Sequence, residues 1–249
     1  MRHFIIVFII LLCQEVNAQP VPVTPRAKVT PENIDSIISF ENQFSQNSTK
    51  PAPPGKKSFE FKSGNKKILF IAGHATAHKR EGQIKPADSG TGSMAVSLNK
   101  LLRVPALYTT FLSLSDPNFE DANEFKDSLA KLLIKIKPVF VIDLHGSNSF
   151  RPYDIDFGTM NRKSFLNRKD MLDTLKVFLK NEGLINQSQD FFSAEQNQTI
   201  TKFVSNKGFP CIQLEINSNY ISAKDGDLFG QKTAQLLQAL IRFVESQSN

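Results

Sequence analysis

The sequence predicts a single three-layer α/β domain, in which helices cover both faces of a mostly parallel, open β-sheet. Short apolar runs alternate along the chain with longer stretches of helical periodicity, and this alternation is typical of βαβ units. The apolar runs are nearly continuous, as expected for strands that are buried on both faces. The chain has 249 residues, of which 40% are apolar, and this is enough for one domain with a large core.

Four apolar runs with polar or turn-forming neighbours are the predicted strands: residues 68–72, 106–111, 139–144 and 210–216. Four further stretches are the predicted helices: residues 91–102, 123–136, 165–180 and 227–246. The last helix is the clearest, because Phe229, Leu236 and Leu240 fall on one helical face. No internal repeat interrupts this pattern, so residues 66–249 are predicted to form one α/β domain.

The first 18 residues have the pattern of a secretory signal peptide. Basic Arg2 begins the segment, an apolar run follows over residues 4–13, and Val16 and Ala18 stand at the −3 and −1 positions of a cleavage site. We expect cleavage after Ala18 and a secreted or periplasmic protein. One cysteine, Cys211, remains after cleavage, so no internal disulfide is expected.

Residues 19–65 are predicted to be a Pro-rich N-terminal extension, because they hold seven of the 13 prolines. One short helix is expected within this extension, since Thr30 can cap a helix that begins at Pro31. Ile34 and Ile38 then share one helical face. The extension is predicted to dock on the main domain.

The charge pattern argues against nucleic acid as a partner. The formal net charge is +6, but the 30 basic residues are dispersed, often beside acidic ones, and form no groove interleaved with aromatic residues. No apolar run reaches the roughly 18 residues that a membrane span requires. We therefore expect neither a nucleic-acid partner nor a membrane span.

Two histidines follow apolar runs directly. His74 comes after Ile-Leu-Phe-Ile-Ala-Gly, and His145 comes after Val-Phe-Val-Ile-Asp-Leu. Ligands of open α/β sheets bind outside the carboxyl ends of the strands, so both imidazoles face one crevice if their strands are neighbours. A shared zinc ion is one interpretation, because imidazole is a common zinc ligand. The other is that each histidine is an ordinary hydrogen-bonded residue.

Glu215 breaks the apolar pattern of the last predicted strand, Cys-Ile-Gln-Leu-Glu-Ile-Asn. A carboxylate buried in such a strand requires a partner or a function. At the carboxyl end of the strand it would face the same crevice as the histidines. A partly desolvated glutamate beside a metal can act as general base and then as general acid. Alternatively, Glu215 faces outward from an edge strand.

The polar segment of residues 78–92 connects His74 to the next predicted helix and is well placed to line the crevice. Asp88 or Glu81 could complete a set of two histidines and one carboxylate around a metal, with a position left for water. Arg80 could pair with a substrate carboxylate through its planar guanidinium. The alternative for each of these residues is a solvated surface charge.

A second polar loop follows His145, and Arg151 in this loop is another candidate for binding an anionic group. Asp143, two residues before His145, is a candidate for orienting a ligating imidazole from behind. The chain has neither a glycine-rich phosphate loop nor a Gly-x-Ser-x-Gly elbow. This argues against nucleotide binding and against serine hydrolase chemistry.

Three separated motifs resemble the N-formylglutamate amidohydrolase family. They are Gly-His74 followed by Arg80-Glu-Gly-x-x-Lys-x-Ala-Asp88-x-x-Thr-Gly, then Val-Ile-Asp-Leu-His145-Gly, then Ile-Gln-Leu-Glu215-Ile-Asn. The Asp-Leu-His motif and the late glutamate are also similar to those of aspartoacylases and zinc carboxypeptidases. The resemblance covers roughly residues 66–245 and implies a phosphorylase/hydrolase-like fold.

The resemblance also implies a site with one zinc ion. His74, Asp88 and His145 would bind the zinc, and Glu215 would be the general base and acid. The carboxypeptidase pattern His-x-x-Glu is absent, because residue 77 is alanine. The acidic ligand is therefore expected further along the chain, at Asp88, with Glu81 as the alternative.

Residues and resemblance together predict a secreted zinc-dependent amidohydrolase. Its expected substrate is a small anionic one, either an N-acyl amino acid like N-formylglutamate or a peptide-like molecule, with Arg80 and Arg151 holding the carboxylate. One alternative is a zinc-dependent cell-wall amidase of the N-acetylmuramoyl-L-alanine type, which the run Leu-Glu215-Ile-Asn-Ser-Asn resembles. Another is a non-catalytic secreted binding protein on the same fold.

Overall fold

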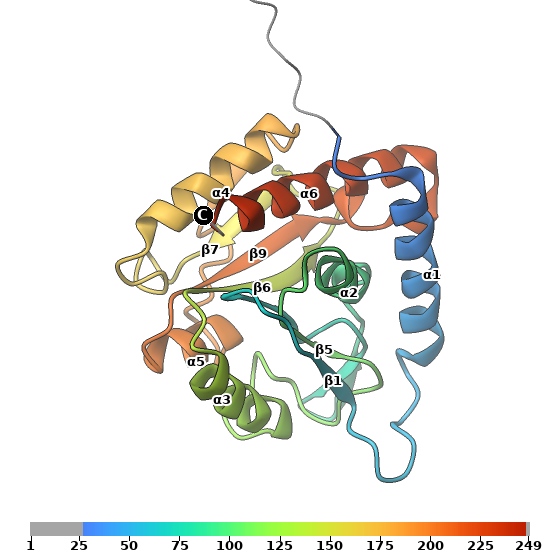
Figure 1. The fold of residues 1–249 in the computed structure, drawn as a ribbon. Helices are drawn as coiled ribbons and strands as arrows, with labels where there is room; N and C mark the ends of the chain where they lie inside the picture. Colours follow the sequence, from blue (N-terminus) through green and yellow to red (C-terminus); the bar gives the residue numbers. More distant parts are fainter. Residues whose placement is uncertain (1–26, 248–249) are drawn as a thin grey trace, which may run out of the picture.

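The computed structural model describes residues 27–247, and it confirms the predicted fold class. These residues form an α/β domain whose seven-stranded, mostly parallel sheet has helices on both faces (Figure 1). The predicted signal peptide, residues 1–18, and the beginning of the Pro-rich extension lie outside the described residues.

The strands of the sheet follow the order β1-β5-β2-β6-β9-β7-β8. The neighbouring strands β5, β2, β6 and β9 are parallel, whereas β1 is antiparallel to β5 and β7 is antiparallel to β9. A separate hairpin consists of β3 and β4. The strand bounds are β1 (Phe59–Lys62), β2 (Ile68–Ala72), β3 (His78–Arg80), β4 (Gln83–Lys85), β5 (Ala106–Thr109), β6 (Phe140–Ser147), β7 (Ile155–Gly158), β8 (Gln187–Gln189) and β9 (Cys211–Asn217).

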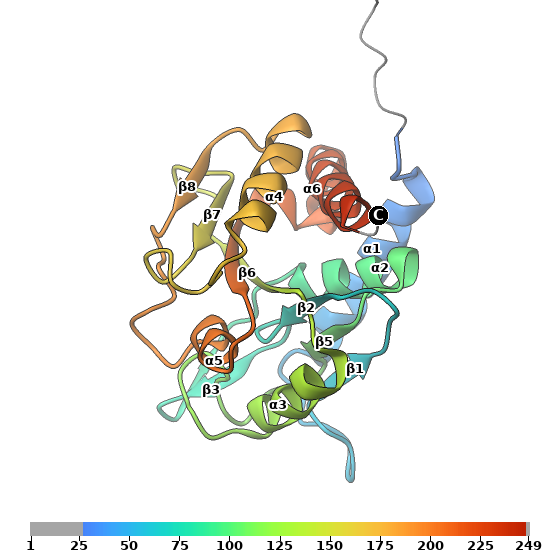
Figure 2. The same cartoon turned by 60° about the vertical axis from the view of Figure 1, so that its left-hand side comes forward.

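The helices form the two outer layers. α1, α2, α4 and α6 pack on one face of the sheet, and α3 and α5 pack on the other (Figure 2). In β2, Phe70 belongs to the first of these cores, whereas Leu69 and Ile71 belong to the second, because successive side chains of a strand point to opposite faces. The helix bounds are α1 (Pro31–Asn47), α2 (Thr91–Leu102), α3 (Glu124–Ile136), α4 (Lys169–Asn181), α5 (Ile200–Asn206) and α6 (Asp227–Ser246).

Local capping sets several helix boundaries. The Asn123 side chain accepts a hydrogen bond from the backbone N–H of Lys126 at 2.8 Å, so α3 begins one residue later than expected. Thr199 caps α5, a helix that the sequence pattern did not indicate, in the same way. α4 begins at Lys169 rather than at residue 165.

Within residues 27–247, no helix is both long and apolar enough to cross a membrane.

Two predicted strands have different limits in the structure. β5 ends two residues early, because the backbone N–H groups of Thr110 and Phe111 both donate to the carbonyl of Ser58 instead of continuing the ladder. β6 runs three residues further than expected, so His145 lies within the strand. The polar loop predicted after it contains β7, a strand in which all four residues are buried, including the charged Asp156.

The described part of the Pro-rich extension packs against the rest of the domain. Ile37 of α1 is fully buried in the core shared with α2 and α6. The Glu41 carboxylate accepts hydrogen bonds from the backbone N–H groups of Ala223 at 3.0 Å and Lys224 at 3.1 Å, just before α6. β1, which also lies in this extension, is an edge strand of the sheet. The packed structure thus begins well before residue 66.

Candidate active site

Side chains from three neighbouring parallel strands meet at one edge of the sheet. β2 leads to His74, β6 carries His145 and β9 carries Glu215. His145 and Glu215 are register partners on adjacent strands. The carboxyl ends of these strands therefore bring the predicted residues into one crevice, as open α/β sheets do.

Asp88 reaches the same edge from the segment after the β3–β4 hairpin. Its backbone N–H donates to the carbonyl of His74 at 2.8 Å, and its carbonyl accepts from the Thr91 hydroxyl at 2.7 Å. Gly90 has a φ of 88°, and a Cβ at this position would lie 1.8 Å from the carbonyl oxygen of Ile221. Glycine is required there, and the resulting close turn holds Asp88 beside the histidines.

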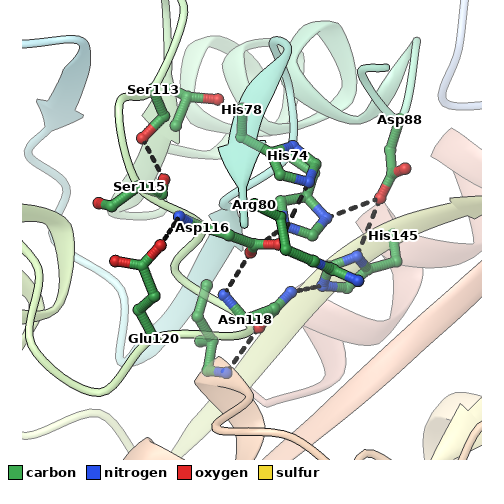
Figure 3. Close-up of polar contacts among 12 residues, drawn as sticks. His74, His78, Arg80, Asp88, Ser113, Ser115, Asp116, Asn118, Glu120 and His145 are labelled. Carbon is green, nitrogen blue, oxygen red and sulfur yellow. Dashed lines mark hydrogen bonds and ion pairs between the residues drawn. The ribbon is translucent and has the colours of Figure 1, made fainter. Parts of the chain in front are cut away.

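The three side chains predicted to bind a metal lie together (Figure 3). Asp88 Oδ2 is 2.9 Å from His145 Nδ1 and 3.5 Å from His74 Nδ1. The two imidazole rings meet edge to face with their centroids 5.0 Å apart. Ligand atoms bound to zinc at ~2.0–2.2 Å in a tetrahedral site lie roughly 3.3–3.5 Å from one another. All three donor atoms lie within 4.8 Å of one another, which is close enough for them to hold one metal ion.

The acidic side chains around this set stabilise positive charge on its two imidazoles. Burial lowers the pKa of His74, but hydrogen bonds to Asp116 and Asp88 outweigh it and raise the pKa above its usual value. The pKa of His145 is raised further, because the charges of Asp143 and Asp88 outweigh burial. Burial raises the pKa of Asp88, and the two histidines more than reverse this, leaving it well below its usual range. Positive charge at this point is therefore stabilised.

Two side chains that the sequence did not predict support the imidazoles from the loop after β5. Asp116 Oδ1 is 2.8 Å from His74 Nε2, and Asn118 Nδ2 is 2.7 Å from His145 Nε2. The predicted Asp143 is fully buried behind the second ring, with its Oδ2 3.4 Å from His145 Nε2. Because these groups contact Nε2 of each ring, Nδ1 of each ring faces Asp88, and the carboxylates fix the ring orientation.

A second group of buried donors consists of His74, His78 and Asp116. The rings of His74 and His78 are stacked, with centroids 3.8 Å apart and planes 8° apart. An ion between two parallel rings would lie well outside both planes, whereas the imidazole lone pairs lie in the planes. Asp116 instead accepts hydrogen bonds from His74 Nε2 at 2.8 Å and from Arg80 Nε at 2.6 Å. We assign this group to the support of His74.

The two acidic alternatives for the metal ligand are separated by the fold. Glu81 lies at the turn between β3 and β4, where it is exposed and has a φ of 51°. Among the residues that the structure describes, it belongs to no group of side chains able to hold a metal, whereas Asp88 does. The geometry favours Asp88.

Glu215 lines a cavity of about 510 Å³ together with the candidate metal ligands and Arg80. Its Oε1 accepts a hydrogen bond from Gln213 Nε2 at 2.7 Å. Burial raises the pKa of Glu215 to about 7, and the negative charges of Asp88 and Asp156 add to this effect. A carboxyl group with such a pKa can both accept and donate a proton near neutral pH.

The two candidate substrate-binding arginines both reach the crevice. Arg80 lines the first cavity, but its Nε is engaged by Asp116 and its guanidinium lies 5.1 Å from the ring of Phe119. Arg151 lines a second, adjoining cavity of about 390 Å³. Glu215 borders both cavities, so the two arginines stand on different sides of the expected reaction centre.

Asp116, Asn118 and His78 are functional candidates that the sequence pattern did not reveal. The segment that holds Asp116 and Asn118 reads as an irregular polar loop and adjoins the site only because β5 lies beside β2. His78 carried one signal, namely that histidine is scarce, with four in the whole chain. No local spacing pointed to the other two.

No protein-family model and no curated protein matches the sequence, but solved structures resemble the fold. N-formylglutamate amidohydrolase from Ralstonia eutropha aligns with a TM-score of 0.55 at 12% identity, over 76% of this chain and 99% of that one. A gene product of Agrobacterium tumefaciens gives 0.52 at 12%, over 78% and 97%. A bacteriophage poly-gamma-glutamate hydrolase gives 0.50 at 13%, over 79% and 93%.

At these identities the likeness shows the fold. The chain has a phosphorylase/hydrolase-like α/β fold, similar to the folds of these three structures. The family of this chain does not follow from the alignments, so its activity has to be argued from its own site.

Proposed function

We propose that the protein is a zinc-dependent hydrolase that cleaves an amide bond of an N-acyl amino acid or a peptide-like substrate. The observation that carries the proposal is the convergence of His74, Asp88 and His145 beside Glu215. Two histidines and one carboxylate are a donor set of catalytic zinc sites, which keep one position open. The fold shared with N-formylglutamate amidohydrolase and poly-gamma-glutamate hydrolase supports amide cleavage.

Different residues of the chain have different roles in such a reaction. Zinc in a site of this kind polarises a substrate carbonyl and activates water. In this proposal Glu215 takes a proton from the attacking water and delivers it to the leaving nitrogen, so that the C–N bond breaks and an acid and an amine form. Asp116 and Asp143 hold the imidazoles in orientation. The two arginines favour an anionic substrate.

Secretion is part of this proposal, and the pattern of residues 1–18 supports it. The mature protein is expected to begin at Gln19. Intact-mass measurement of the exported protein tests this directly, because retention of the first 18 residues would contradict the proposed location.

Turnover by matched variants tests the proposed chemistry. The purified protein, loaded with one equivalent of zinc, is expected to release the amine from N-acyl amino acids. Glu215→Gln should keep the zinc and lose at least ~10³-fold in kcat. Glu81→Gln is the control, because it removes the same charge from the exposed hairpin and should leave turnover unchanged.

Two results would contradict the proposed function. Full activity of Glu215→Gln would remove the assigned proton carrier. Tight substrate binding without any turnover in the zinc-loaded protein would instead favour a secreted binding protein on this fold.

A further inference from the structure

The crevice continues past Glu215 into the second cavity, which the proposed hydrolysis of a small substrate does not require. This cavity of about 390 Å³ lies between residues 86–89, the loop after β6 and residues 218–222. Four residues border both cavities: Asp88, Gly146, Phe192 and Glu215. The reacting groups therefore lie between two spaces rather than at the closed end of one.

Arg151 gives the second cavity its chemical character. Its guanidinium carbon is 5.4, 5.6 and 5.0 Å from the ring centroids of Phe150, Phe191 and Phe192, so three aromatic rings surround the cation. The Nε atom is buried without a hydrogen-bond partner, and no acidic side chain of residues 27–247 forms an ion pair with this arginine. A caged guanidinium with unused donors is suited to a planar carboxylate.

The first cavity has a different character. Apart from the candidate metal ligands, Arg80, Asp190 and Glu215, the polar side chains of this cavity are uncharged: Asn118, Ser193, Gln196, Asn197, Thr199 and Gln213. Arg80 is partly neutralised there, because its Nε is bonded to Asp116. This side therefore suits peptide or hydroxyl groups more than a second carboxylate.

The two volumes exceed what a formyl group requires. Pockets of roughly 300–1,000 Å³ hold whole drug-sized ligands, and the cavities measure about 510 and 390 Å³. A formylated amino acid would leave one side of the crevice almost empty. Each side has room for at least one residue of a chain.

We propose that the substrate is a chain that extends on both sides of the scissile amide, and that Arg151 binds a carboxylate of this chain in the second cavity. The substrate class is an anionic oligomeric amide, such as a peptide or isopeptide that carries a side-chain carboxylate. This inference rests on the proposed amide hydrolysis and deepens it.

A substrate series with matched variants tests the inference. The series compares N-formylglutamate with N-acyl dipeptides that carry a glutamate on one side or the other of the scissile amide. Each dipeptide has a counterpart in which this glutamate is replaced by glutamine. We expect the zinc-loaded protein to cleave the longer substrates at least ~10-fold better than N-formylglutamate, and to prefer glutamate on one side. Arg151→Gln should lose ~10–100-fold in kcat/KM on the preferred substrate and should no longer discriminate glutamate from glutamine.

Two controls separate charge from geometry. Arg151→Lys keeps the charge but not the planar fork, and should recover only part of the loss. Arg103→Gln removes the same charge at the far end of α2 and should behave as the wild type. Equal kcat/KM for N-formylglutamate and the longer substrates, or a loss below about twofold in Arg151→Gln, would overturn the inference.

A binding measurement keeps the test independent of turnover. Calorimetric titration with glutarate should show ~10–100-fold weaker binding to Arg151→Gln than to the wild type and Arg103→Gln. If no substrate is cleaved but this difference is found, the proposed hydrolysis fails and the carboxylate site stands. If glutarate binds all three proteins equally, the carboxylate site is refuted.

Discussion

Asp116 is the carboxylate on which most hydrogen bonds of the site converge. It is fully buried and contacts His74 Nε2, Arg80 Nε and the backbone N–H of Asn118, at 2.8, 2.6 and 2.8 Å. Burial raises its pKa, but the hydrogen bonds from His74 and His78 outweigh this and hold the pKa far below its usual range. The group is therefore held in its ionised form.

We expect Asp116→Asn to weaken zinc binding by ~10–100-fold, because an amide orients and polarises the imidazole less well than a carboxylate. Competition with a chelator of known zinc affinity measures the change. Asp121→Asn, an exposed substitution in the same loop, is the control. Identical zinc affinities of the two variants would contradict the role assigned to Asp116.

Glu215 is expected to lower the stability of the metal-free protein at alkaline pH. Its folded-state pKa of about 7 is higher than the usual 4.5, so the folded state binds the proton more tightly than the unfolded state. Stability therefore falls as the pH rises between these two values. Glu215→Gln cannot ionise, yet it keeps an acceptor for Gln213.

The variant should consequently be more stable than the wild type by about 3 kcal/mol near pH 8, and similar to it near pH 4. Urea unfolding in the presence of a chelator gives both differences. A stability difference that does not change with pH would contradict the raised pKa.

Residues with a strong local signal were predictable, and residues defined by strand order were not. His74, His145 and Glu215 are polar groups at the ends of apolar runs, and this pattern can be recognised in the sequence alone. Asp116 and Asn118 have no such signal, because they reach the histidines only through the pairing of β5 with β2. Motif resemblance supplied the choice of Asp88, which spacing alone left open against Glu81.

The same distinction holds at the scale of elements. β2, β6 and β9 are largely buried on both faces, and they were predicted within a few residues. β4 is exposed along its whole length and β8 is polar, so neither has the periodicity that identifies a strand. β1 and β7 are short and carry charged residues, and they join the sheet through pairing partners far along the chain.

α1 is the element whose importance the sequence understated. Its central residue Ile37 is fully buried against the core that α2 and α6 share. We expect Ile37→Ala to lower the free energy of unfolding by about 2–4 kcal/mol, through lost burial and the cavity that remains. Ser39→Ala on the exposed face of the same helix is the control.

Chemical denaturation of the two variants measures the difference. A cost below about 0.5 kcal/mol for Ile37→Ala would mean that α1 is only loosely attached to the domain. In that case the Pro-rich extension would be dispensable for the stability of the site.

On the scale of the whole molecule, the strand order assembles the site from segments that are distant in sequence. The neighbours β5, β2, β6 and β9 bring the loop with Asp116, then His74, His145 and Glu215 to one edge. The segment that follows the β3–β4 hairpin brings Asp88 to the same edge. The fold class was predictable because strands and helices alternate, whereas the second cavity was not, since its walls come from four separate segments.

The central claim is that His74, Asp88 and His145 bind one zinc ion. Elemental analysis after zinc loading and dialysis tests it most directly, with His145→Ala and Glu81→Gln measured beside the wild type. The account predicts one equivalent of zinc in the wild type and in Glu81→Gln, and less than about a tenth of an equivalent in His145→Ala. Zinc below about a tenth of an equivalent in the wild type, with no binding on titration, would contradict it.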